Sequence, residues 1–238
     1  MKIVVLDGET TNPGDLSWER LEKLGELTVY ARTKPKELYE RAKEAELLIT
    51  NKTVLSGKMI RSLKNLKYIG TLSTGFNVVD IHAARELGIP VCNVPSYCTN
   101  AVAQMTFSLL FALTNHVALH NHSVHQGDWE NSTDFCYWKA PLVELESKKF
   151  WSVRVWQHRP DCSKNSGGPG NERIGLQQDK KRHCLQGYRW VSQEELFRES
   201  DVLSLHCPLT PETTGLVNRK TLSLMKPTAY LINTSRGR

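Results

Sequence analysis

Short apolar runs alternate with amphipathic segments along the first hundred residues, and this alternation constrains the fold more than any other feature of the sequence. The runs at residues 3–6, 27–30, 47–50, 68–71 and 89–94 are predicted strands, with predicted helices at residues 38–45 and 78–87. Strands that alternate with helices at this spacing predict an α/β fold with a parallel sheet covered on both faces.

The same alternation resumes near the end of the chain. After a long helical pattern at residues 101–124, Ser192 and Glu195 form a capping-box motif that begins a helix running to about Glu199. Residues 202–206 and 229–232 are predicted strands, with a predicted helix at 218–225. The long helix is expected at the boundary between two α/β domains.

Composition favours a globular chain without a membrane segment. Of the 238 residues, 39% are hydrophobic and 24% are charged, which excludes wholesale disorder. The longest apolar runs are only a few residues long, so no transmembrane helix is predicted and no membrane partner is expected. One lysine and four apolar residues precede Asp7, too few for a signal peptide, so we expect a cytoplasmic protein.

Neither the cysteines nor the histidines predict a metal site. The six cysteines contain no C-x-x-C pair and are expected to be reduced. They are Cys92, Cys98, Cys136, Cys162, Cys184 and Cys207. A second group, His116, His120, His122 and His125, lacks a carboxylate or cysteine to complete a ligand set, so we expect a solvated cluster at the end of a helix.

Residues 151–186 interrupt the pattern. Only 9 of these 36 residues are apolar, and Pro160 and the run Gly167-Gly168-Pro169-Gly170 break any periodicity, so we expect poor order. Seven basic residues against three acidic ones place +4 of the formal net charge of +6 here. Nucleic-acid binding is an alternative interpretation, which salt-dependent binding to duplex DNA would support, but we expect no nucleic-acid partner.

Four stretches resemble the D-isomer-specific 2-hydroxyacid dehydrogenases, particularly the glycerate dehydrogenase or hydroxypyruvate reductase branch. They read KYIGTLSTGFNVVD at 67–80, NVPSYCTNAVAQ at 93–104, SLHCPLTPET at 204–213 and LINTSRG at 231–237. Because the four matches keep their order along the chain, the signal is specific. The resemblance covers residues 1–150 and 187–237.

This resemblance implies a domain organisation, a cofactor and a substrate class. It implies a flavodoxin-like substrate-binding domain at residues 1–98 and a Rossmann-type, doubly wound NAD(P)-binding domain at residues 99–238, incomplete and with the disrupted segment 151–186. NAD is the implied cofactor, with NADP left open, and the substrate is a small 2-hydroxy or 2-keto acid such as glycerate or hydroxypyruvate. A homodimer is also implied, although the disrupted cofactor domain counts against it.

The resemblance also assigns roles to particular residues. Arg236 matches the family arginine that holds the substrate's carboxylate and keto oxygen, a task that suits a planar guanidinium, and the backbone N–H groups of Thr74 and Gly75 are implied to bind the same carboxylate. The residues implied to line the dinucleotide are Thr99, His206, Cys207, Pro208, Thr213, Asn233 and Thr234. The alternatives are a surface arginine at 236, a plain turn at Gly75, a helix cap at Thr99 and a loop stop at Pro208.

The family's pyrophosphate-binding turn is absent from the sequence. A G-x-G-x-x-G turn between a strand and a helix is expected between the second and third matching stretches, where its glycines let the backbone approach the pyrophosphate. Gly167-Gly168-Pro169-Gly170 is no substitute, because no predicted strand leads into it and Pro169 removes a backbone donor. The acidic residue that selects NAD over NADP falls in the same segment.

A one-nucleotide shift of the reading frame over residues 150–186 would restore that turn. Joining the last two bases of each codon to the first base of the next makes Trp151-Ser152 and Trp156-Gln157 encode glycine with any serine or glutamine codon. The neighbouring pairs permit Gly-Val-Phe-Gly-Phe-Gly-Asn-Ile-Gly, then an amphipathic helix and, over residues 171–177, a strand. We infer a frameshifted segment, which explains its charge and composition without a nucleic-acid function.

The sequence also lacks the residue that transfers the proton in this family. In the family, a glutamate and a histidine downstream of the Arg-Gly motif form the catalytic pair, with the histidine as general acid/base, and the sequence stops at Arg238, one residue past Gly237. His206 does not replace that histidine, because it belongs to the His-Cys-Pro motif. We therefore expect an oxidoreductase by descent with little or no activity in this chain. The alternative is a catalytically dead module that senses the dinucleotide.

Overall fold

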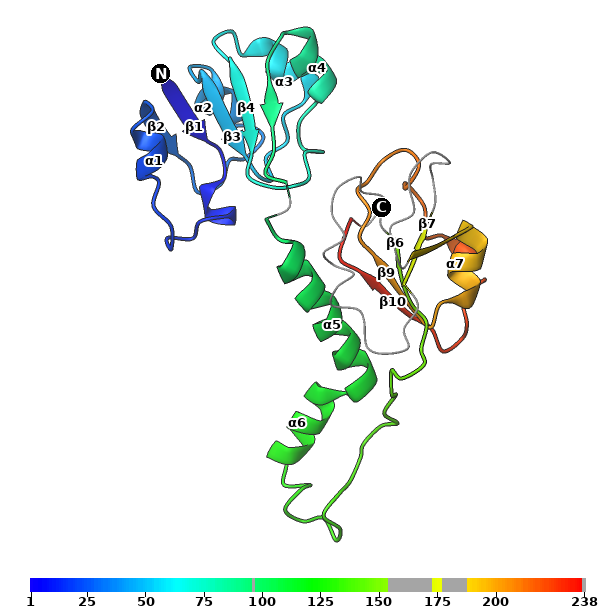
Figure 1. Ribbon diagram of the computed structural model, residues 1–238. Helices are drawn as coiled ribbons and strands as arrows, with labels where there is room; N and C mark the ends of the chain where they lie inside the picture. The colour runs from blue at the N-terminus through cyan, green and yellow to red at the C-terminus, as the bar shows by residue number, and fades with distance from the viewer. Residues whose placement is uncertain (96, 154–172, 177–187, 237–238) are drawn as a thin grey trace. The chain divides into compact units, whose positions relative to one another are not determined.

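The computed structural model describes residues 1–95, 97–153, 173–176 and 188–236. These residues form two compact units, Met1–Tyr97 and Cys98–Arg238 (Figure 1). Each unit has its own five-stranded sheet, and every pair of neighbouring strands is parallel.

The sheet of the first unit has the strand order β2-β1-β3-β4-β5. Its strands are β1 (Lys2–Val5), β2 (Glu26–Val29), β3 (Leu47–Thr50), β4 (Tyr68–Thr71) and β5 (Val91–Cys92). The helices are the 3-10 helix η1 (Gly8–Thr10), α1 (Glu19–Glu22), α2 (Leu38–Ala42), α3 (Gly57–Ser62) and α4 (Ile81–Glu86). The side chains of Ser56 and Asp80 begin α3 and α4 by accepting hydrogen bonds from backbone N–H groups.

The alternation of side chains along β1 gives this sheet an apolar core on both faces. Val4 clusters with residues of α2, α3 and α4, whereas Ile3 and Val5 cluster on the opposite face with Trp18 and with Leu21 of α1. Because both faces are occupied, the loops at the carboxyl ends of the strands are the natural positions for ligand-binding groups.

The sheet of the second unit has the order β10-β9-β6-β7-β8, which is the Rossmann-type order read from its other edge. Its strands are β6 (Phe150–Val153), β7 (Arg173–Leu176), β8 (Tyr188–Val191), β9 (Val202–Leu205) and β10 (Tyr230–Asn233). The helices are α5 (Thr99–Asn115), α6 (Val117–His125), α7 (Gln193–Glu199) and α8 (Arg219–Leu222). The order reverses between β6 and β9.

Two apolar clusters hold the second unit together. Trp151 of β6 is fully buried in one cluster with Phe197 of α7. In the other cluster, Phe107 of α5 stacks on Phe150 with the ring centroids 5.6 Å apart, beside Ile232 of β10. The α/β fold class predicted from the sequence is therefore confirmed.

The single helix predicted over residues 101–124 is wrong, because His116 divides it into α5 and α6. His116 has left-handed backbone angles, φ 48° and ψ 41°. The carbonyl of Thr114 accepts a hydrogen bond from the N–H of Val143, and the hydroxyl of Thr114 donates to the carbonyl of Leu110. The first bond satisfies a carbonyl group in the last turn of α5, and a threonine that bonds back to the preceding turn bends a helix.

Two predicted strands are also too long. The strand predicted over residues 89–94 is reduced to Val91–Cys92, because Pro90 has no backbone N–H and the N–H of Val94 donates to the carbonyl of Ser73. The strand predicted to reach His206 ends at Leu205. His206 consequently belongs to the loop after β9.

The prediction that residues 151–186 are poorly ordered is wrong for the two parts of this segment that the structure describes, residues 151–153 and 173–176. Trp151 and Val153 are fully buried in β6, and Arg173–Leu176 form β7 beside it. The average over 36 residues hid the local alternation of Trp151 and Val153. β7 lies where the shifted frame also predicts a strand, whereas the predicted turn, the helix and the Gly167–Gly170 run lie outside the described residues.

No single helix in the described part of the chain is long and apolar enough to cross a membrane. α5 and α6 satisfy the length and composition only as a pair, and they are bent by 59° where they meet. Four of the cysteines lie in the described ranges, and all four are free: Cys92, Cys98, Cys136 and Cys207.

Asp201 forms hydrogen bonds at the amino ends of strands β6, β9 and β10. We expect these bonds to make the stability of the second unit pH-dependent. The carboxylate of Asp201 accepts the N–H of Lys149 at 2.8 Å and pairs with the ammonium of Lys226 at 2.9 Å. Burial alone would raise the pKa of Asp201, but the Lys149 N–H and the Lys226 ammonium outweigh it and hold the pKa below 3.8. A lowered pKa stabilises the fold above the ordinary value, and this stabilisation is lost as the pH falls through the lowered one.

The variant Asp201→Asn should therefore lower the free energy of unfolding by roughly 1–3 kcal/mol at neutral pH. The difference from the parent chain should shrink once the pH falls below 3.8, the ordinary pKa of the group. Urea unfolding at neutral and at acidic pH measures both quantities, with the exposed Asp134→Asn as the control. A difference that is the same at both pH values would contradict the assignment.

Candidate functional site

Three neighbouring strands of the second sheet end side by side, and polar residues follow two of them. Val153 of β6, Leu205 of β9 and Asn233 of β10 are aligned across the sheet. His206 follows β9, and Thr234 follows β10. Since the strand order reverses between β6 and β9, this edge is where a doubly wound sheet opens a crevice for a ligand.

His206 forms hydrogen bonds through both ring nitrogens. The hydroxyl of Ser204 lies 2.8 Å from Nε2, and that of Thr234 lies 2.9 Å from Nδ1. The Thr234 hydroxyl also lies 3.4 Å from the carbonyl of Leu205. These contacts bring two predicted cofactor residues, His206 and Thr234, together.

The loop after His206 is fixed by Thr213. The buried hydroxyl of Thr213 donates to the carbonyl of Pro208 at 2.6 Å, and the N–H of Thr210 donates to the same hydroxyl at 2.8 Å. Cys207 is buried in the apolar cluster, and this burial raises the pKa of its thiol. Cys207, Pro208 and Thr213 therefore lie in one hydrogen-bonded turn in which the thiol stays protonated.

The loop after β10 presents Arg236 to solvent. The side-chain oxygen of Asn233 accepts the N–H of Ser235 at 2.9 Å, and its amide nitrogen donates to the carbonyl of Arg236 at 3.3 Å. The Arg236 side chain is exposed, and within the described residues its guanidinium forms no ion pair. Asn233 therefore orders the backbone that carries the Arg236 guanidinium. Gly237 lies outside the described residues.

In the first unit, the loop after β4 presents backbone donors. The hydroxyl of Ser73 donates to the carbonyl of Gly75 at 2.7 Å, that of Thr74 to the carbonyl of Val94 at 2.9 Å, and the amide of Asn93 to the carbonyl of Thr74 at 2.7 Å. The N–H groups of Thr74 and Gly75 donate to no acceptor among the described residues. A fixed loop with two unpaired N–H groups is suited to binding an anion.

Thr99 begins α5, and the histidine cluster lies at the end of α5 and along α6. Thr99 is the first residue of α5 and Cys98 occupies the cap position, so the helix-cap interpretation of Thr99 is wrong. In the histidine cluster, the Nδ1 of His120 bonds to the carbonyl of His116 at 3.0 Å, and its Nε2 accepts the N–H of Lys139 at 3.2 Å. Over the described ranges, no three histidine, cysteine or carboxylate groups lie close enough to hold a metal ion.

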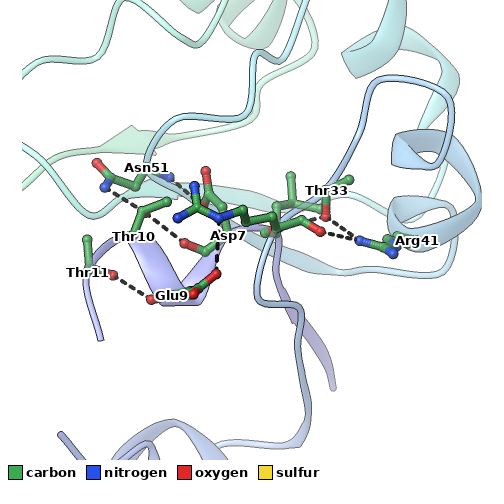
Figure 2. Close-up of polar contacts among 10 residues, drawn as sticks. Asp7, Glu9, Thr10, Thr11, Thr33, Arg41 and Asn51 are labelled. Carbon is green, nitrogen blue, oxygen red and sulfur yellow. Dashed lines mark hydrogen bonds and ion pairs between the residues drawn. The ribbon is translucent and has the colours of Figure 1, made fainter. Parts of the chain in front are cut away.

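The sequence alone does not single out Ser204, whose hydroxyl contacts His206, or Asp7, whose carboxylate is buried. Ser204 lies inside a strand, where the sequence pattern indicates only a buried position. Asp7 is a buried carboxylate that follows the first apolar run, so its place at the carboxyl end of a predicted strand was a usable signal. Figure 2 shows Asp7 near Thr10 and Asn51 at this end of the sheet.

The chain belongs to the D-isomer specific 2-hydroxyacid dehydrogenase family, because residues 3–226 match the model of that family's catalytic domain. It is 40% identical over 241 residues to a hydroxypyruvate reductase of Blautia hydrogenotrophica, with all of this chain and 75% of the relative aligned. It is 31% identical to a glycerate dehydrogenase of Methylorubrum extorquens over 99% of this chain and 73% of that relative.

Solved structures show the same fold. An acyclic imino acid reductase in complex with NADPH and D-Arg aligns with a TM-score of 0.86 at 29% identity, over all of this chain and 75% of that one. A D-lactate dehydrogenase from Aquifex aeolicus, complexed with NAD and lactic acid, aligns with a TM-score of 0.81 at 26% identity, over all of this chain and 69% of that one. The family resemblance stated from the four sequence stretches is confirmed.

Proposed function

We propose that the chain descends from an NAD(P)-dependent reductase of hydroxypyruvate, or of a closely related 2-keto acid, that also runs in the reverse direction. The observation that carries the proposal is the pair of N–H groups at Thr74 and Gly75, which have no acceptor among the described residues and lie in a loop fixed by three hydrogen bonds. Such donors fit the carboxylate that every 2-keto acid carries. The 40% identity to a hydroxypyruvate reductase supports the choice of substrate.

In this proposal the first unit, Met1–Tyr97, binds the substrate and the second unit, Cys98–Arg238, binds the cofactor. The described part of the second unit fits a dinucleotide, because hydrogen-bonding groups of His206 and Thr234 follow the strands beside the point where the strand order reverses. The residues that follow β6 lie outside the described residues, and their sequence contains no G-x-G-x-x-G turn. The part of the site that fits a dinucleotide therefore consists of the loops after β9 and β10, which contain most of the predicted cofactor residues.

The cofactor supplies or accepts a hydride at C2 of the substrate. The chain's own residues bind and orient: the N–H groups of Thr74 and Gly75 hold the carboxylate, and the Arg236 guanidinium binds the carboxylate and keto oxygen and polarises the carbonyl. The residues proposed for the dinucleotide are Thr99, His206, Cys207, Pro208, Thr213, Asn233 and Thr234. The resemblance assigns the proton donor to a histidine downstream of the Arg-Gly motif.

The proposal predicts activity in a repaired chain. Codons 151–186 are read in the shifted frame, and the protein is fused after Gly237 to the corresponding last part of the Blautia relative. This chain should oxidise NADH or NADPH with hydroxypyruvate. Arg236→Ala should lower kcat/KM by about 100-fold to 1000-fold, because two charge-assisted hydrogen bonds are lost. Exposed Lys220→Ala, away from the proposed site, is the control, and a repaired chain that rejects every 2-keto acid would contradict the proposal.

A further inference from the structure

Asp7 is a buried carboxylate at the carboxyl end of β1. Only 2% of it is exposed. Its Oδ1 accepts the N–H of Asn51 at 2.8 Å, and its Oδ2 accepts the N–H groups of Lys52 at 2.6 Å and Thr53 at 2.7 Å and the Thr53 hydroxyl at 3.1 Å. Three backbone N–H groups that converge in this way form an anion-binding concavity, and Asp7 fills it from within the chain.

These bonds fix the loop that follows β3. The Thr50 hydroxyl bonds to the carbonyl of Thr53 at 2.9 Å, and the Asn51 amide donates to the hydroxyl of Thr10 at 2.8 Å (Figure 2). That hydroxyl in turn donates to the carbonyl of Asp7 at 2.7 Å. Hydrogen bonds to both the backbone and the side chain of Asp7 therefore hold residues 51–53 at the end of β1.

The loop of residues 51–53 lies beside the loop that carries Thr74 and Gly75. Thr50 and Thr71 are paired in register in neighbouring parallel strands, and the N–H of Leu72 donates to the carbonyl of Thr50 at 2.9 Å. The loops after β3 and β4 consequently leave the sheet next to each other. The loop after β3 holds N–H groups that Asp7 already satisfies. The loop after β4 holds N–H groups, those of Thr74 and Gly75, for which the described part of the chain offers no acceptor.

We propose that Asp7 is a positioning residue for 2-keto acid binding. Its carboxylate occupies the N–H groups of residues 51–53 and holds their loop in place, so that the neighbouring loop keeps its own donors, those of Thr74 and Gly75 among them, directed to the substrate's carboxylate. The inference rests on the proposed function, because it takes those two N–H groups as the substrate's binding site.

The test uses the 238-residue chain and oxalate, a planar dicarboxylate that resembles a 2-keto acid. Oxalate binding is followed through the backbone amide signals of Thr74 and Gly75, below the temperature at which each variant unfolds. Asp7→Ala should weaken oxalate binding by about tenfold or more. Formate, a carboxylate small enough to enter the vacated space, should restore binding in this variant, and formate added to the parent chain controls for competition with oxalate.

Matched variants separate positioning from stability alone. Asp15→Ala removes an exposed carboxylate of the same unit and should bind oxalate like the parent. If Asp7→Ala does not fold, Asp7→Asn, which keeps one acceptor oxygen, replaces it and should also weaken binding. Parent-like oxalate affinity in a folded Asp7 variant overturns the positioning role and leaves the proposed function standing. If oxalate does not shift the Thr74 and Gly75 signals of the parent chain, the proposed function fails, and the inference that rests on it fails with it.

Discussion

Reading codons 151–186 in the shifted frame is expected to raise the affinity of the 238-residue chain for NADH by at least about 100-fold. In the shifted frame that we infer, a G-x-G-x-x-G turn directly follows the codons of β6. At a helix N-terminus, backbone N–H groups of such a turn bind the pyrophosphate. Each charge-assisted hydrogen bond contributes roughly 1.5–3 kcal/mol, and two of them suffice for the predicted factor.

Titration of the intrinsic fluorescence of NADH measures this affinity in both chains. A third chain controls for a general improvement in folding: it has the shifted frame, but a valine replaces the second glycine of the turn. Because the valine side chain blocks the close approach of the pyrophosphate, this chain should bind as weakly as the unshifted one. Equal NADH affinity of the unshifted and shifted chains would remove the reason for inferring a frameshift.

Trp151→Ala in the unshifted chain is expected to lower the free energy of unfolding by about 3–5 kcal/mol. Trp151 is the largest fully buried side chain in the described part of the chain, and it packs in the cluster of β6, β9 and α7. Among the described residues, its indole N–H has no hydrogen-bond partner. Removing the side chain leaves a large cavity beneath α7, and only part of the loss is regained by removing an unsatisfied polar group.

Trp151→Phe separates these two contributions. The phenylalanine keeps most of the apolar volume and removes the unpaired N–H, so the loss should be at most about 1.5 kcal/mol. Trp138→Ala, at a side chain that is 71% exposed, should change the stability by less than about 0.5 kcal/mol. Urea unfolding followed by circular dichroism gives all three values. An effect of Trp151→Ala no larger than that of Trp138→Ala would show that β6 is not part of the core.

The sequence predicts the first sheet well because its strands follow simple patterns, whereas in the second sheet its unshifted reading predicts only β9 and β10. Residues 47–50 and 68–71 coincide with β3 and β4, and Ser192 caps α7 as the sequence indicates, since its hydroxyl accepts the N–H of Glu195. Residues 101–124 were misassigned because the apolar period continues across His116, while the break depends on a hydrogen bond from Val143, far along the chain. Such a bond leaves no local signal in the sequence.

The candidate site is predictable where motifs follow strands and unpredictable where partners come from elsewhere. His206 and Thr234 were proposed separately from two motifs, and their 2.9 Å contact follows from the neighbouring positions of β9 and β10. The sequence does not predict the contacts of Asp7, because its partners, Asn51 to Thr53, lie more than forty residues along the chain. Only the order of the strands brings these residues together.

The nucleotide sequence of the gene over codons 148–190 shows whether the dinucleotide-binding turn is encoded but read out of register. We expect the shifted frame to be open from codon 150 to codon 187 and to encode glycine at all three positions of a G-x-G-x-x-G turn, two of which depend on the codons used for Arg154 and Arg159. A stop codon in the shifted frame, or codons at Arg154 and Arg159 that exclude glycine there, would contradict this expectation.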